Sequence, residues 1–198
     1  MILPKRPAIV EHFIKGICDS RTWVFSLLVL LALIVTGEIL THFVEPHIRY
    51  NKTASMPLGF YWDGPVGINL ARGDLVFFCP SPEIISRGLA VGIHSVNGEE
   101  CPTHTASFLK RIIAIPGDLV DTRKGDIRVN GKVIPRSTPI SGPRGRLLQS
   151  ILPQTYKVAP NQAWGISEDP FGYDSRYYGS FQPIGRAYPL ITWKAHSL

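Results

Sequence analysis

Two residues of this chain, a serine and a lysine, lie in sequence surroundings that suit the cleavage of peptide bonds. Ser55 lies in the segment 53–59, which reads TASMPLG, and Lys110 begins the segment 110–118, which reads KRIIAIPGD. A serine hydroxyl is a weak nucleophile until a base removes its proton, and an unprotonated lysine can be that base. The pair therefore predicts a serine peptidase.

A lysine acts as a base near neutral pH only when its surroundings disfavour its charge. Apolar residues flank Lys110, and in a strand its side chain shares a face with Phe108 and Ile112. Lowering its pKa from about 10.4 to about 8 requires roughly 3 kcal/mol in favour of the neutral form. Each residue alone has an ordinary alternative, because strand lysines commonly point into solvent and serines in turns commonly bond the backbone.

Two further segments follow the same order along the chain as the serine and lysine segments. Residues 73–76 read GDLV and residues 174–179 read DSRYYG, so the four segments together span residues 53–179. In this combination, behind an apolar N-terminal run, the chain resembles the type I signal peptidase family. Within that family, the segment 52–62, which reads KTASMPLGFYW, is similar to the conjugative-transfer peptidases called TraF, as is the short chain length.

The resemblance implies a role for each matching position. Ser55 would be the nucleophile and Lys110 the general base, while the Ser55 backbone N–H and the Thr53 hydroxyl would form the oxyanion hole. Asp174 and Arg176 are expected to pair and to brace the site rather than to deliver protons, and an ordinary structural salt bridge is the alternative for them. The resemblance implies no cofactor and no metal.

One position departs from the family. General signal peptidases carry a serine two residues before the aspartate of the last segment, where its hydroxyl helps to hold the lysine, and this chain has Gly172 there. Another group, such as a water molecule or a backbone carbonyl, must therefore orient Lys110.

The elements that must position these residues begin with an N-terminal apolar run. Residues 22–37 contain no charged residue, and apolar residues from 39 to 44 extend the run past Glu38 to the length of about 20 residues that a membrane span needs. A buried amphipathic helix would show a polar face, and this run shows none. A cleaved signal sequence is the other alternative, but no small-x-small cleavage site follows promptly, so we expect an uncleaved anchor.

Charge predicts how the chain is oriented in the membrane, because Lys and Arg tend to stay in the cytoplasm and four of them precede the run. We expect a cytoplasmic segment at 1–21, a transmembrane anchor with a juxtamembrane stretch at 22–44, and a peptidase domain at 45–198. By resemblance, the chain crosses the bacterial inner membrane once, with its N-terminus cytoplasmic and its catalytic domain periplasmic. Cys79 and Cys101 follow the anchor and either form a disulfide or pack as separate small apolar side chains.

The rest of the chain is predicted to be mainly β, because short apolar runs alternate with Gly, Pro, Asn and Asp. An Asn-Gly pair at 130–131 between two such runs predicts a hairpin with a type I′ turn. Residues 135–153 favour a long excursion, and residues 82–91 favour a helix. The other candidate strands cover residues 59–62, 74–78, 109–115, 163–167 and 188–193. The predicted fold is a signal-peptidase-like antiparallel β catalytic domain with one N-terminal transmembrane helix.

The net charge of +6 does not indicate a nucleic-acid partner, because no run of Lys and Arg exceeds two and no basic patch is interleaved with aromatic residues. We expect a membrane-anchored serine endopeptidase with a Ser-Lys dyad that processes exported precursor proteins. TraF-like members mature, and in some cases cyclise, the pilin of a conjugation machine, so the implied partners are a precursor or pilin, membrane lipid and components of a conjugation or type IV secretion assembly. The alternatives are a general leader peptidase and a non-catalytic membrane-tethered β module of such an assembly.

Overall fold

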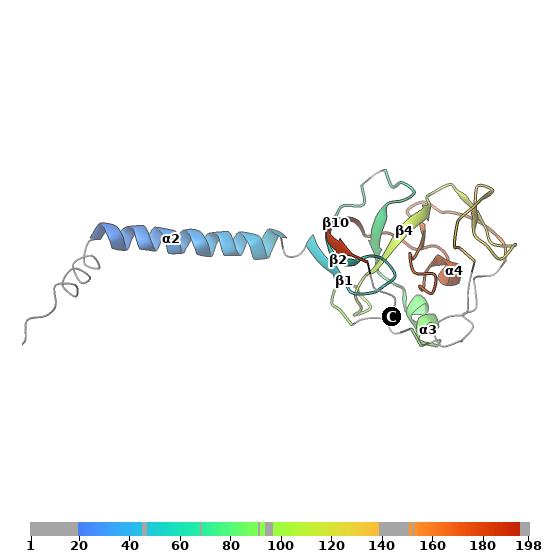
Figure 1. The fold of residues 1–198 in the computed structure, drawn as a ribbon, viewed down its shortest axis with the longest axis horizontal. Helices are drawn as coiled ribbons and strands as arrows, with labels where there is room; N and C mark the ends of the chain where they lie inside the picture. The colour runs from blue at the N-terminus through green and yellow to red at the C-terminus, as the bar shows by residue number, and fades with distance from the viewer. Residues whose placement is uncertain are drawn as a thin grey trace, which may run out of the picture. The chain divides into compact units, whose positions relative to one another are not determined.

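The computed structural model describes residues 20–44, 47–67, 69–90, 92–93, 97–138, 151 and 153–194 (Figure 1). Its contacts divide the chain into two compact units, Met1–Pro46 and His47–Leu198. The described part of the first unit is helical. The second unit is β-rich and carries both Ser55 and Lys110.

The first unit contains the expected apolar helix. Helix α2 covers Ser20–Ile39 and continues as a π-helix, η1, over Leu40–Val44. The span Arg21–Val44 has 24 residues and a mean hydropathy of 2.4, and none of it is buried inside the protein. A helix that is apolar on all sides fits a lipid environment. The rest of the predicted cytoplasmic segment 1–21 lies outside the described residues.

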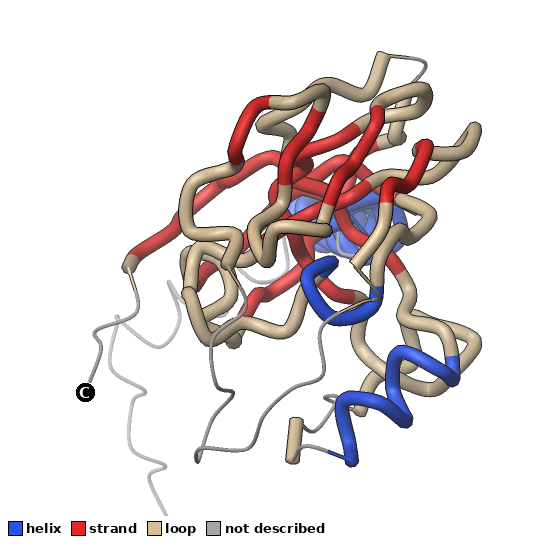
Figure 2. The backbone as a smooth tube through the Cα atoms, turned by 90° about the vertical axis from the view of Figure 1, so that its right-hand side faces the viewer, coloured by secondary structure: helices blue, strands red, loops and turns tan. Residues whose placement is uncertain are grey.

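In the second unit, the strands that position the site form an antiparallel sheet with the order β1-β2-β10-β3-β4-β9. Their bounds are β1 Ile48–Asn51, β2 Leu58–Gly64, β3 Leu75–Phe78, β4 Phe108–Ala114, β9 Trp164–Ile166 and β10 Gly185–Trp193. The pairing shifts between Pro189 and Ile191 in β10 and between Ile112 and Ala114 in β4. Such irregularities increase local twist, and the strands are seen to curl through this unit in Figure 2.

A second antiparallel sheet has the order β7-β6-β5-β8. Its strands are β5 Leu119–Asp121, β6 Arg128–Val129, β7 Lys132–Val133 and β8 Thr155–Lys157. The predicted hairpin is confirmed between β6 and β7, where Asn130 and Gly131 have φ angles of 49° and 81°. Positive φ at both central residues is the geometry of a type I′ turn. Most of the predicted excursion at 135–153 lies outside the described residues.

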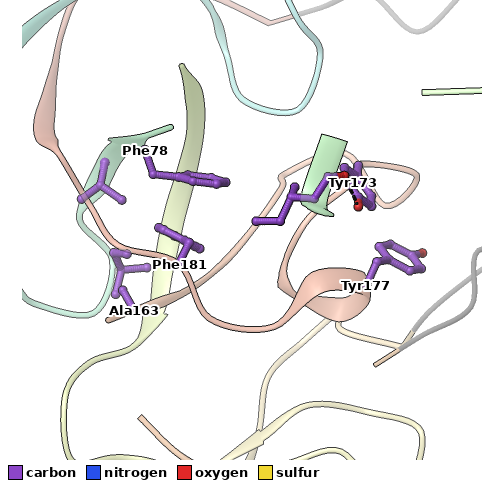
Figure 3. Close-up of a cluster of buried hydrophobic side chains, with 8 residues drawn as sticks. Phe78, Ala163, Tyr173, Tyr177 and Phe181 are labelled. Carbon is purple, nitrogen blue, oxygen red and sulfur yellow. Dashed lines mark hydrogen bonds between the residues drawn. The ribbon is translucent and has the colours of Figure 1, made fainter. Parts of the chain in front are cut away.

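Two short helices pack near the first sheet. The predicted helix is confirmed as α3, Pro82–Ala90, and the Ser81 hydroxyl accepts a hydrogen bond from the Ile84 N–H at 3.3 Å. Helix α4 covers Ser175–Tyr178 and follows Asp174 directly. Its residue Tyr177 belongs to a buried apolar cluster that also contains Phe78 and Phe181 (Figure 3). The rings of Phe78 and Phe181 stack with their centroids 4.0 Å apart. This packing fixes the segment around Asp174 against the sheet.

A disulfide joins Cys79 to Cys101, with their Cα atoms 5.4 Å apart. The sequence left this pairing open. The bond ties the end of β3 to the segment that leads into β4, so it limits how far these two neighbouring strands of the site can separate in the unfolded chain.

Candidate active site

Ser55 lies in a turn between β1 and β2 that a buried asparagine holds together. Asn51 donates from its side-chain amide to the carbonyl oxygens of Thr53, Met56 and Pro57, at 3.0, 3.1 and 3.0 Å. Its Oδ1 accepts from the Thr53 backbone N–H at 3.2 Å and from the Thr53 hydroxyl at 2.9 Å. One side chain thus satisfies backbone groups on both sides of Ser55, which fixes the conformation of the turn.

Sequence reasoning assigned no role to Asn51. It begins an Asn-Lys-Thr glycosylation sequon, a short motif that is frequent by chance. In the structure this side chain is buried and its amide is used within the turn. The available signal was an asparagine at the start of a turn rich in Ser, Thr and Pro, because asparagine side chains often bond nearby backbone in turns.

The hydroxyls of Thr53 and Ser55 lie 2.9 Å apart. A hydroxyl has a single proton, so while Thr53 donates to Asn51 it accepts from Ser55. The Ser55 carbonyl oxygen accepts from the Glu168 N–H at 2.7 Å. This bond connects the turn to the segment that follows β9.

Lys110 lies in β4 and is buried, with 4% of its surface exposed. Burial lowers the pKa of the Lys110 amine from 10.5 to about 8, because the charged form loses its hydration; the charges of Asp174 and Asp169 oppose this shift and the charge of Arg176 adds to it. The amine nitrogen lies 5.7 Å from the centroid of the Phe108 ring. Near pH 8, therefore, about half of the lysine is neutral and able to accept a proton.

Ser55, Thr53 and Lys110 line one pocket of about 270 Å³. The pocket's other walls include Arg49, Asn51, Phe77, Phe108, Leu109, Asp169, Phe171 and Tyr173. Gly165 of β9 leaves room for the lysine, since a Cβ at this position would lie 2.9 Å from the Cβ of Lys110. The fold thus brings together a hydroxyl and a partly neutral amine that are 55 residues apart in the sequence.

Asp174 and Arg176 form a buried ion pair, and neither residue lines the pocket. The Asp174 carboxylate accepts from Arg176 Nε at 2.8 Å, from Arg176 Nη2 at 2.7 Å and from the Ser167 N–H at 2.8 Å. Arg176 also donates to the carbonyl oxygens of Pro170 and Gly172, at 2.8 and 2.9 Å. The pair therefore connects the end of β9 to the loop that carries Asp169, which is part of the pocket wall.

Comparison with known proteins identifies the family. A family model described as signal peptidase, peptidase S26, matches residues 20–187. The chain belongs to this family. It is therefore a serine peptidase of the signal peptidase type, as the motifs predict, with the mainly β domain and the apolar N-terminal helix expected of it. Family membership and this helix together indicate a single-pass membrane protein.

The relatives of this signal peptidase include several transfer proteins. It is 29% identical over 153 residues to the plasmid transfer protein TraF of Escherichia coli, a match that covers 73% of this chain and 83% of that protein. It is 31% identical over 149 residues to the conjugal transfer protein TraF of Agrobacterium tumefaciens (strain 15955), with 73% and 82% covered. It is 26% identical over 178 residues to the conjugal transfer protein TraF of Agrobacterium fabrum (strain C58 / ATCC 33970), with 88% and 98% covered. The peptidase is thus TraF-like and related to conjugation.

Proposed function

We propose that this signal peptidase cleaves a conjugative pilin precursor at the periplasmic face of the bacterial inner membrane, with Ser55 as nucleophile and Lys110 as general base. The observation that carries the proposal is the burial of Lys110, which lowers its pKa to about 8, in the same pocket that Ser55 lines. A lysine desolvated in this way, in a pocket that a serine also lines, is the arrangement that nucleophilic catalysis without histidine needs.

In the first half of the reaction, the neutral Lys110 amine takes the proton of the Ser55 hydroxyl as Ser55 Oγ attacks the carbonyl carbon of the scissile bond. The Ser55 N–H donates to the oxyanion that forms, and the Thr53 hydroxyl turns its single proton from Asn51 Oδ1 to the same oxygen. The C–N bond then breaks, and Lys110 returns its proton to the leaving amine. The product of this half is an ester between the precursor fragment and Ser55.

In the second half, a nucleophile attacks the ester carbonyl while Lys110 accepts its proton, and Ser55 leaves with that proton restored. When the nucleophile is water, the product is a cleaved pilin with a free carboxylate. When it is an amine of the same substrate, the product is a cyclic pilin. Both routes use the same residues of this chain.

The proposed location follows from charge and from the disulfide. Basic residues precede the apolar span, which favours a cytoplasmic N-terminus. The Cys79–Cys101 bond lies after the span and suits an oxidising compartment such as the periplasm. Membrane lipid, the precursor and components of a conjugation or type IV secretion assembly are the partners proposed on this basis, and the pilin itself is proposed from the resemblance to the TraF peptidases.

The test is to express the full chain in bacterial membranes with the pilin precursor of its conjugation system and to follow the precursor's mass. We expect the wild type to convert the precursor and Ser55→Ala to convert it at least about 10³-fold more slowly, because no other group attacks the carbonyl. Ser86→Ala, which changes an exposed serine of α3, is the matched control and should process normally. A product lighter than the cleaved pilin by one water would show cyclisation. Undiminished processing by Ser55→Ala would leave a tethered binding module as the better explanation.

Replacing Thr53 with valine should lower kcat by about 10²-fold with little change in KM, because the proposed oxyanion loses one donor in the transition state. Valine keeps the shape of the side chain, and Asn51 keeps its bonds to the backbone of the turn. The measurement is steady-state kinetics on a peptide that spans the cleavage site, together with denaturant unfolding. A loss of stability with kcat unchanged would mean that the Thr53 hydroxyl serves only the turn.

A further inference from the structure

Ser167 carries a buried hydroxyl that none of the described residues bonds. The residue is 7% exposed and directly follows β9, and its Oγ has no hydrogen-bond partner among the described residues. Its backbone N–H is occupied by Asp174, so the hydroxyl itself is left free. Buried polar groups are nearly always paired, so a buried hydroxyl without a protein partner calls for an explanation.

The strand register places Ser167 opposite Lys110. The β4–β9 ladder pairs Arg111 with Ile166, and the next antiparallel pair in this register is Lys110 with Ser167. Opposed residues on antiparallel strands have their side chains on the same face of the sheet. Gly165, two residues before Ser167 and therefore on that face, would place a Cβ 2.9 Å from Lys110 Cβ. The face of β9 that carries Ser167 is thus the face turned toward the lysine.

The glycine at position 172, in the loop that follows β9, leaves room for the Ser167 side chain. A Cβ at Gly172 would lie 2.3 Å from both the Cβ and the Oγ of Ser167. The Ser167 side chain therefore fills the space that a side chain at position 172 would need. Gly172 is the position at which this chain departs from general signal peptidases, which carry a serine there. Here the same space is occupied by a hydroxyl that comes from the strand rather than from the loop.

We propose that Ser167 is a positioning residue for the base, and that its free hydroxyl is the hydrogen-bond partner that the Lys110 amine uses as it takes the proton of Ser55. This inference rests on the proposed Ser-Lys dyad. A hydroxyl suits the task because it can donate to a neutral amine and accept from a charged one. The bond forms in the substrate complex, as catalytic hydrogen bonds often tighten only there.

The charged groups around Lys110 are engaged in other hydrogen bonds. Asp174 already accepts two hydrogen bonds from the Arg176 side chain and one from the Ser167 N–H. The Asp169 carboxylate accepts from the Phe171 N–H at 2.9 Å. Arg176 carries the same charge as the protonated lysine and donates to carbonyl oxygens of the loop. Ser167 is the uncharged group that the strand register places opposite Lys110, and no described residue bonds its hydroxyl.

The first test is Ser167→Ala in the full chain. We expect kcat to fall about 10- to 100-fold with KM within about twofold of wild type, because the amine is no longer held toward Ser55. The acidic limb of the pH profile of kcat, which reports the substrate complex, should move to lower pH, since the ammonium form loses a hydroxyl that could solvate it. Ser137→Ala is the matched control, because it removes a buried hydroxyl that bonds the backbone of Ile127 and Ile134 and has no place opposite Lys110, and its kcat and pH profile should stay as in wild type.

A second readout does not depend on cleavage. The Lys110 amine is titrated by NMR in lysine-labelled protein that holds an uncleavable peptide analogue of the cleavage site, because the proposed bond forms in the substrate complex, and its signal is assigned by its loss in Lys110→Ala. A lowered pKa in Ser167→Ala supports the proposal, whereas a pKa that rises toward 10.5 would mean that Ser167 only seals the site from water. Full activity in Lys110→Ala would refute the dyad itself. Full activity in Ser167→Ala alone would refute only the role of Ser167.

Exchanging the two facing residues tests the hydroxyl separately from packing. Ser167→Gly loses the hydroxyl, and Gly172→Ser alone forces two side chains into one space, so both single variants should lose activity. Ser167→Gly combined with Gly172→Ser should recover at least about tenfold over Ser167→Gly, because the hydroxyl returns from the other wall. Ser167→Gly combined with Gly172→Ala fills the same space without a hydroxyl. Equal recovery by this second pair would overturn the proposal.

Discussion

Replacing Lys110 with methionine should abolish cleavage and at the same time stabilise the protein at neutral pH. We expect kcat to fall by at least about 10⁴-fold, because Ser55 loses its base and the two residues act as a unit. Methionine has a similar length and no charge to desolvate. At pH 7 the wild type must hold a mostly protonated lysine in a site that is 4% exposed, and the variant does not.

The size and pH dependence of this stabilisation follow from the pKa of Lys110. The folded chain releases the Lys110 proton near pH 8 and the unfolded chain only near 10.5, so the unfolded state binds more protons between these values. The free energy of unfolding of the wild type therefore rises with pH across this window. The destabilising effect of Lys110 is fully present below about pH 8, amounts to about 3 kcal/mol, and disappears above about pH 10.5.

Denaturant unfolding at pH 7 and at pH 9.5 measures this difference. Lys110→Met should be more stable than the wild type at pH 7, and its advantage should be much smaller at pH 9.5. The wild-type kcat/KM should rise with pH, and the midpoint of this rise should lie near pH 8, because only the neutral amine accepts the proton of Ser55. A variant that is inactive but less stable at pH 7 would show that Lys110 carries no penalty for its charge, and retained cleavage would show that another group is the base.

The parts of this protein that sequence could predict are those encoded locally. The apolar helix, the Asn-Gly hairpin at 130–131 and helix α3 each depend on neighbouring residues, and all three are confirmed. Strand β1 was missed because residues 48–51 have little apolar character and follow the membrane helix. Its strand conformation comes from pairing with β2, where Ile48 lies opposite Trp62. Strands β5 and β8 have three residues each and depend in the same way on each other.

The candidate site also has a part that is encoded locally and a part that depends on the folded sheet. Ser55 and Lys110 lie in recognisable segments, so the sequence could predict them as catalytic residues. The burial that lowers the lysine pKa is produced by the packing of several elements around β4. Ser167 lies in a segment that the sequence predicted as a strand. Its significance depends on which strand it pairs with, and the register Arg111 to Ile166 is a property of the folded sheet. No local pattern contains that information.

Replacing Arg176 with methionine should lower the free energy of unfolding by about 3–5 kcal/mol, because it leaves the Asp174 carboxylate buried without its partner. The two side chains are 1% and 0% exposed, so water does not replace the lost bonds. The carbonyl oxygens of Pro170 and Gly172 lose their donor as well. Asp174→Asn should have a loss of similar size, since it leaves the guanidinium buried and unpaired.

The matched control is the Asp121–Arg123 pair, which has the same spacing in the sequence but an arginine side chain that is 64% exposed. Arg123→Met should lower the free energy of unfolding far less than Arg176→Met does, because an exposed ion pair is screened by water. Denaturant unfolding at pH 7 compares the three variants with the wild type. A loss for Arg176→Met as small as that of Arg123→Met would rule out a bracing role.

The pH profiles of the two buried-pair variants distinguish bracing from proton delivery. The charge of Asp174 raises the pKa of Lys110 and that of Arg176 lowers it, so Asp174→Asn should shift the acidic limb of kcat/KM to lower pH and Arg176→Met should shift it to higher pH. The profiles are measured at a temperature at which unfolding shows both variants to be folded. A pair that braces the site and sets its electrostatics gives these opposite shifts with partial activity. An aspartate that delivered protons would instead give a loss in Asp174→Asn as large as that in Lys110→Met, at every pH.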